Sequence, residues 1–66
     1  MAVVKVIEII AESPESWEAA TADAVAEASK TVQNIISVYV DSQQAIVEDN
    51  KIVRFRVATK ISFMVK

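Results

Sequence analysis

The chain contains no cysteine, no histidine and no glycine. Disulfides are therefore impossible, and a zinc site lacks its usual ligands. The chain length of 66 residues is enough for one domain, which spans residues 1–66. A domain of this length buries only about 60% of its unfolded surface, so small domains usually need such staples or partner chains. Apolar residues nevertheless make up 53% of the chain. Either this excess only fills the core or, as we expect, it forms interfaces with other chains.

The missing residue types also exclude several functions. Without glycine there is no P-loop, dinucleotide fingerprint or G-x-S-x-G motif, and without histidine or cysteine the usual nucleophile–base pairs are absent. We assign no catalytic residue and expect no enzyme. The net charge is −2 and there is no cluster of Lys and Arg residues, which argues against nucleic-acid binding. The apolar stretch Val3 to Ala11 is too short to span a membrane and lacks the features of a signal peptide, so we expect a cytoplasmic protein.

The first expected element is a strand over residues 3–10, VVKVIEII. Its β-branched residues lose rotamer freedom in a helix and pack well on a pleated surface. Apolar side chains occur at both parities, with Val4 and Val6 on one and Val3 and Ile7 on the other. A strand that is apolar on both faces is expected to be covered on both. In one small sheet with one helix, the second cover must come largely from another subunit.

A helix is expected to begin at Ser13-Pro14-Glu15 and to run to Gln33 or Asn34. Serine caps the first turn, and proline fits the first helical position because that N–H has no intrahelical partner. Asn34 suits the C-terminal cap, since asparagine tolerates the left-handed conformation. The apolar stripe is mostly alanine, so the helix should lie close against its sheet. Its members are Trp17, Ala20 or Thr21, Ala24, Val25, Ala28 and Val32.

Two long strands follow, over residues 35–47 and 51–65, with Asp49-Asn50 at the centre of a two-residue turn. Both turn residues tolerate the positive φ that a tight hairpin needs. Strands of this length span roughly 40 Å and the helix roughly 30 Å, so one end of the hairpin should reach a neighbouring subunit. The first of these strands alternates an apolar set, Ile36, Val38 and Val40, with a more polar set, Ser37, Tyr39 and Asp41. The apolar set is expected to face the helix, and the other set forms a more polar face.

The elements predict an α+β protein with the order β-α-β-β. Because a helix joins the first two strands, these run parallel to each other, and the third strand runs antiparallel to both. The simplest arrangement places the third strand in the centre of an antiparallel sheet. Its apolar parity, which includes Val57 and Ile61, should face the helix, and its polar parity, which includes Arg54 and Arg56, should face away.

A few side chains are candidates for ligand contacts. Asp41, Glu48 and Asp49 are of the types that bind hard cations, but turn and surface charge is the favoured interpretation and we assign no metal site. Trp17 is expected to pack in the core. Tyr39 lies beside Ser37 on the more polar face of the hairpin, where an aromatic ring is not needed for packing against the helix. Its ring is therefore expected either to stack on a planar ligand or to fill a subunit interface.

The combined pattern resembles the dodecin family. The likeness is carried by VVKVIEIIAESPESWEAATADAVAEASKTV, the following NI, a long strand, a tight turn and the closing RFRVATKISF, and it runs from Val3 to Val65. The resemblance implies a three-stranded antiparallel sheet partly wrapped around one helix, assembled as a hollow homododecamer. It also implies non-covalent binding of a flavin (FMN, riboflavin or lumichrome), for storage, buffering and photoprotection.

Two positions depart from the family's flavin site, where a tryptophan stacks on the isoalloxazine ring and a glutamine hydrogen-bonds its polar edge. Aligned without gaps, these positions fall on Ser37 and Arg56. The lost stacking, about 1–3 kcal/mol, weakens binding roughly five- to 150-fold. Arginine donates hydrogen bonds but does not accept them, so Arg56 either binds an anionic ligand such as a flavin phosphate or pairs with Asp41 or another carboxylate across the subunit interface. Tyr39 is the nearby ring able to compensate.

The candidate flavin-binding residues are therefore Ser37, Tyr39 and Arg56. One hypothesis is a flavin-binding and flavin-storage dodecin in which the usual tryptophan and glutamine are replaced. The alternative is a structural or assembly protein of the same fold that has lost flavin binding or binds another small anionic ligand. Fold and assembly support both hypotheses equally.

Overall fold

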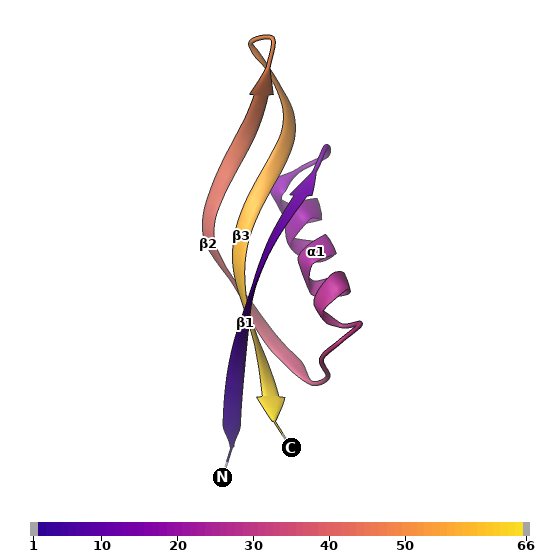
Figure 1. The fold of residues 1–66 in the computed structure, drawn as a ribbon, viewed down its shortest axis with the longest axis vertical. Coiled ribbons are helices and arrows are strands. Elements are labelled where there is room, and N and C mark those ends of the chain that lie inside the picture. Colours follow the sequence, from indigo (N-terminus) through magenta and orange to yellow (C-terminus); the bar gives the residue numbers. More distant parts are fainter. Residues whose placement is uncertain (1, 66) are drawn as a thin grey trace.

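The computed structural model describes residues 2–65 (Figure 1). Its elements are β1 (Val3–Ser13), α1 (Trp17–Ala28), β2 (Ile35–Glu48) and β3 (Lys51–Val65). They form one antiparallel sheet in the order β1-β3-β2, with α1 against it. The predicted β-α-β-β order and the central place of the third strand are confirmed.

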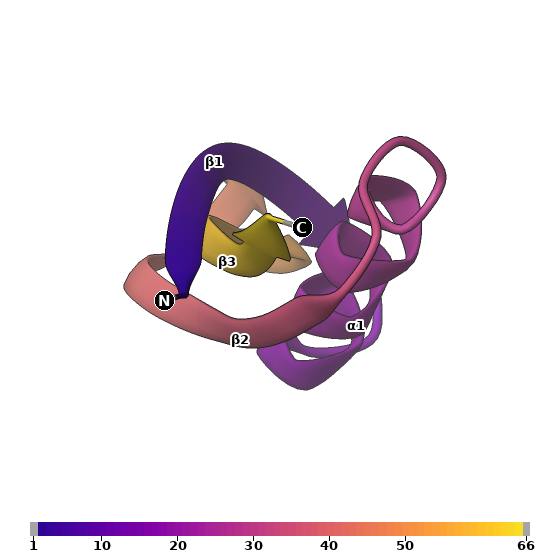
Figure 2. The same ribbon diagram turned by 90° about the horizontal axis from the view of Figure 1, so that it is seen from below.

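The molecule is long and narrow, with extents of 51 × 19 × 14 Å. Figure 1 shows the β2–β3 hairpin reaching well beyond the end of α1. Viewed along the long axis, β1 and β2 curve around the central β3 and α1 lies to one side (Figure 2). The hairpin thus outruns its helix, as the strand lengths predict.

The core lies between α1 and β3 and is built from small side chains. Ala20, Ala24 and Ala28 form the buried stripe of the helix, and Val57 and Ile61 are the largest fully buried side chains. Because alanine leaves little between backbones, α1 lies close against the sheet. The predicted alanine stripe is therefore confirmed, although the core that it creates is small.

The helix begins three residues later than expected. Ser16, not Ser13, is the N-cap, and its Oγ accepts a hydrogen bond from the Ala19 N–H over 2.9 Å. Ser13 remains the last residue of β1, where it pairs with Phe55. Its Oγ instead accepts from the Glu15 N–H over 3.0 Å, which supports the turn into the helix.

The helix also ends earlier than expected, at Ala28 with Ser29 as its C-cap. Side chains beyond this point bond back to helix carbonyls, since Ser29 Oγ donates to Ala26 O and Thr31 Oγ1 to Ala28 O. Such local bonds compete with helix continuation. The chain then turns and returns Val32 to the edge of the core.

Within residues 2–65, three residues other than glycine adopt a positive φ, the conformation that glycine usually provides. Asp49 and Asn50 have φ of 51° and 64°, which confirms the predicted two-residue turn. Asn34 has φ of 63°, as its residue type allows, but it precedes β2 rather than capping the helix. Its carbonyl accepts a hydrogen bond from the Met64 N–H over 2.9 Å, which joins the start of β2 to the end of β3.

Strand β2 departs from simple alternation. Its pairing with β3 shifts between Ile35 and Ser37, between Val40 and Ser42, and again near the turn. The first shift leaves Ile36 exposed, while Ile35 and Val38 pack against the core. The prediction that Ile36 faces the helix is therefore wrong, because a bulge changes which residues share a face.

Candidate functional site

The face of the sheet turned away from α1 carries the candidate residues. Strand alternation places it opposite the buried Val57, Thr59 and Ile61. We call this surface the open face. It comprises Glu8, Ile10 and Glu12 of β1, Arg54, Arg56, Ala58, Lys60 and Ser62 of β3, and Ser37, Tyr39, Ser42 and Gln44 of β2.

The pairing register places the three predicted flavin residues along this face. Ser37 lies opposite Ser62, Tyr39 opposite Lys60, and Arg56 opposite Gln44. Ser37 and Tyr39 are therefore neighbours, whereas Ser62 lies about 20 Å along β3 from Arg56. One chain does not bring all three predicted residues together.

Tyr39 offers a ring on this surface. Its side chain is 60% exposed, although it sits in the middle of a strand. Ser37 is exposed beside it. The ring is thus available to a ligand or to another subunit, and both alternatives from the sequence stay open.

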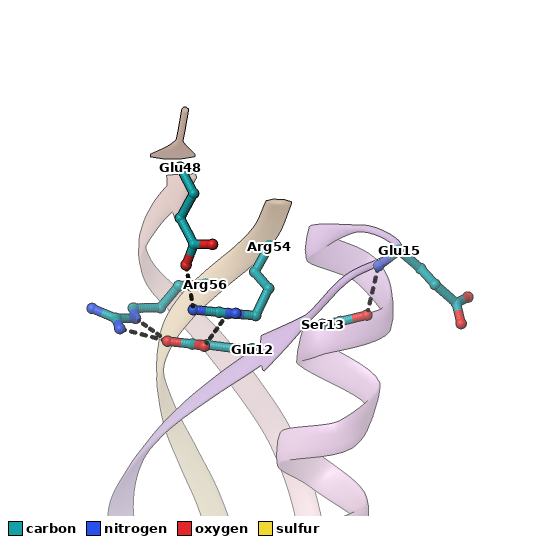
Figure 3. A network of polar contacts seen from close by, with 6 residues as sticks. All are labelled: Glu12, Ser13, Glu15, Glu48, Arg54 and Arg56. Atoms are coloured by element: carbon teal, nitrogen blue, oxygen red, sulfur yellow. Dashed lines mark hydrogen bonds and ion pairs between the residues drawn. The ribbon is translucent and has the colours of Figure 1, made fainter. Parts of the chain in front are cut away.

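Arg56 is held by a carboxylate of the same chain. Its Nε donates to Glu12 Oε2 over 2.7 Å, and its Nη2 lies 2.5 Å from the same oxygen. Arg54 Nε donates to the other oxygen, Oε1, over 2.9 Å. Figure 3 shows the Glu12 carboxylate between the two guanidinium groups. Arg56 therefore pairs with Glu12 of its own chain, whereas the sequence predicted a carboxylate across the subunit interface.

The two arginines also set the protonation of Glu12. The hydrogen bond from Arg56 is the largest cause of a lowered pKa of the Glu12 carboxyl, and the charge of Arg56 and the contacts of Arg54 act in the same direction. Partial desolvation opposes them. The carboxylate is accordingly charged at neutral pH, where it pairs with both guanidinium groups.

Two cavities open beside this network on the open face. One, of about 120 Å³, is lined by Ile10, Ser42, Gln44, Arg56 and Ala58. The other, of about 280 Å³, lies further along β3 and brings Glu8, Asp41 and Lys60 to its wall. Both cavities are lined by a mixture of apolar and polar residues.

The acidic candidates do not form a cation site within one subunit. Among residues 2–65, no group of three or more Asp and Glu side chains is placed to hold a metal ion. Glu48 instead lies 3.9 Å from Arg54 Nη2, and Asp41 lines the same cavity as Lys60.

Comparison with known proteins identifies the family that has this architecture. A family model described as Dodecin matches residues 3–66. The chain belongs to the dodecin family. It is 38% identical over 66 residues to calcium dodecin of Mycobacterium tuberculosis, a match that covers all of this chain and 93% of that protein.

Solved dodecins share the fold. The structure of the M. tuberculosis calcium dodecin, described as calcium chelating with a novel calcium-binding site, has a TM-score of 0.84 at 38% identity, covering 97% of this chain and 91% of that one. The dodecin of Streptomyces davaonensis gives 0.92 at 25% identity, covering 98% and 96%. A variant of the Thermus thermophilus dodecin gives 0.93 at 24% identity, covering 100% and 97%, which shows the fold alone.

In this dodecin, Trp17 has a structural contact. Its ring meets Phe55 edge to face, with centroids 4.9 Å apart and an interplanar angle of 70°. The indole Nε1–H donates to the carbonyl of Gln44 over 2.9 Å. Trp17 thereby ties the start of α1 to the hairpin, in line with the expected packing role.

Glu12 is the site residue that the sequence prediction missed. The first strand was expected to end at residue 10, whereas β1 of this dodecin continues to Ser13 and sets Glu12 opposite Arg56. A signal was present, since Glu8, Ile10 and Glu12 share one parity.

Within residues 2–65, no helix is long and apolar enough to cross a membrane.

Proposed function

We propose that this dodecin assembles into a homododecameric shell and binds a small ligand without catalytic turnover. The observation that carries the assembly is the uncovered sheet. Val4, Val6 and Ile10 are 47%, 53% and 69% exposed on strand β1. A covering subunit removes this apolar surface from water, at about 25 cal/mol per Å².

The mass in solution tests the assembly. Light scattering after size-exclusion chromatography should give the mass of a homododecamer at micromolar protein. Ile10→Asp should lower that mass, whereas Ala26→Asp on the exposed side of α1 should not. A wild-type monomer or dimer refutes the shell.

The first ligand candidate is a flavin-type planar molecule stacked on Tyr39, whose exposed ring stands next to Ser37 and opposite Lys60. Quenching of riboflavin, FMN and lumichrome fluorescence on titration with protein tests it. Tyr39→Phe should retain the quenching, and Tyr39→Ala should lose it. Absence of quenching by all three flavins at high micromolar wild-type protein rejects this candidate.

The second candidate is calcium, which is favoured by the 38% identity to a calcium dodecin and by the net charge of −2 per chain. A negative shell concentrates cations. Because one chain lacks a set of three acidic ligands within its described part, the site would be completed between subunits. Calorimetric titration with calcium, with magnesium as comparison, tests it, and the absence of heat with calcium rejects it.

A further inference from the structure

The arginine pair on the open face carries more charge than its close partner neutralises. Two guanidinium groups, Arg54 and Arg56, bind the single carboxylate of Glu12. The other acid of the network, Glu48, approaches only Arg54, at 3.9 Å, and is itself largely exposed. A contact that long between exposed groups contributes little, so positive charge remains uncompensated at the pair.

Arg56 also has N–H donors that its contacts with Glu12 do not use. Its contacts with Glu12 use Nε and Nη2, whereas a guanidinium has five N–H donors on three nitrogens. In Figure 3 the remaining terminal nitrogen of Arg56 carries no dashed line and points away from Glu12. The side chain is 40% exposed in the single chain, so its free N–H donors are not used within the subunit.

The 120 Å³ cavity beside Arg56 is lined by groups that donate hydrogen bonds. Its polar side chains are Ser42, Gln44 and Arg56, and Ile10 and Ala58 form the rest of its wall. Gln44 lies opposite Arg56 across the β2–β3 ladder, and Ser42 lies opposite Ala58. A hydroxyl, an amide N–H₂ and a guanidinium suit an oxyanion, and no carboxylate lines this cavity.

We propose that the cavity formed by Ser42, Gln44 and Arg56 binds a phosphoryl group, either free or carried by a larger ligand. Arg56 supplies the charge, because arginine hydrogen-bonds phosphate oxygens in the same planar geometry as carboxylates. Glu12 holds the guanidinium in place and competes with the ligand for it. The net negative charge of the chain opposes binding only weakly, since charges beyond about 8 Å are screened at physiological ionic strength.

Calorimetric titration of the assembled protein with pyrophosphate tests the site. Arg56→Gln should weaken binding at least about tenfold, because it removes a charge-assisted contact. Glu12→Gln should tighten binding by about three- to tenfold, because the competing carboxylate is lost. Lys60→Gln is the matched control. It removes the same charge from the same face outside the cavity and should change affinity less than about twofold.

Flavins then distinguish the source of the phosphoryl group. A preference for FMN over riboflavin that disappears in Arg56→Gln means that the group is carried by a flavin. Pyrophosphate binding without such a preference means that it is taken from another phosphorylated molecule or from free phosphate. Either result supports the site, and the pyrophosphate titration stands even where no flavin binds.

Two results overturn the proposal. One is the absence of pyrophosphate binding by both the wild type and Glu12→Gln. The other is an equal loss of affinity in Arg56→Gln and Lys60→Gln, which would indicate general attraction to the face rather than a site. Unchanged elution volume and circular dichroism of each variant show that the fold and assembly are retained.

Discussion

Arg56 lies directly opposite Glu12 across the β1–β3 ladder, and its Nε donates to Glu12 Oε2 over 2.7 Å. The resemblance to flavin-binding dodecins places a glutamine at this position. A neutral amide is free to meet a ring edge, whereas this arginine is held by a charged partner on the neighbouring strand. An arginine at this position therefore adds Glu12 as a charged partner and changes the local charge of the open face.

The Glu12 network should make stability depend on pH in the acid range. Its folded-state pKa is lowered, first by the hydrogen bond from Arg56, below the ordinary value of 4.5. The unfolded chain then binds the proton more readily, so the stabilisation is present above about pH 4.5 and is lost as pH falls through the lower folded value. The melting temperature of Glu12→Gln should lie below that of the wild type at neutral pH, and the difference should shrink on acidification.

Glu27→Gln is the control for this pH series. Glu27, near the end of α1, and Lys30, just beyond it, form an ion pair at 3.4 Å whose side chains are about two-thirds exposed. Such a pair contributes little, so its melting curve should follow the wild type at every pH. Measurements at one protein concentration are required, because oligomers melt in a concentration-dependent way. A Glu12→Gln difference that persists unchanged in acid contradicts the assigned role.

Ser16→Ala should destabilise the protein by about 1 kcal/mol, the usual cost of removing an N-cap oxygen. The Ala19 N–H loses its acceptor at 2.9 Å in this variant. Ser29→Ala, at the other end of the helix, removes only an exposed side-chain bond and should stay within about 0.5 kcal/mol. Denaturant unfolding measures both, and equal effects of the two variants would contradict the assignment of the cap.

The local pattern around the helix allows its existence to be predicted but not its ends. The sequence pattern predicts a cap at Ser13, whereas Ser16, two residues after Pro14, is the N-cap. The choice between them depends on how far β1 pairs with β3, because Ser13 stays paired with Phe55. That pairing is a long-range contact, and residue types near the helix do not encode it.

Asn50→Ala should cost about 1 kcal/mol, because alanine lacks the short polar side chain whose local hydrogen bonds let asparagine adopt the left-handed region. Asn50 has φ of 64° at the hairpin turn. Asn50→Gly should leave stability equal or slightly higher, because glycine adopts this conformation freely. Denaturant unfolding of the two variants provides a matched comparison at one backbone position. A loss in the glycine variant as large as that in the alanine variant would show that the asparagine side chain, not φ, matters.

The open face was predictable in its composition but not in its contacts. Alternation along β3 correctly separates Arg56 from the buried Val57. The partner of Arg56 depends on the length of β1, and the neighbours of Tyr39 depend on bulges in β2. Bulges add one residue to one strand only, so period-two alternation misplaces residues such as Ile36.

Trp17→Phe should cost about 0.5–1 kcal/mol. The variant keeps a ring edge against Phe55 but loses the hydrogen bond from Nε1 to the Gln44 carbonyl. A hydrogen bond of this kind contributes about 0.5–1.5 kcal/mol, and partial exposure favours the lower end. Denaturant unfolding measures the change. Unchanged stability would mean that water replaces the indole at that carbonyl without cost.

Ser37→Trp should tighten riboflavin binding by roughly five- to 150-fold, because it restores a stacking surface of about 1–3 kcal/mol beside Tyr39. Fluorescence quenching on titration measures it. Ser62→Trp is the control, since Ser62 lies directly opposite Ser37 on the same face but on the neighbouring strand. A gain specific to Ser37→Trp would support a flavin site at this position that lacks a stacking ring. Equal gains would indicate that any added ring attracts flavin, and the absence of a gain would indicate that the open face no longer forms a flavin site.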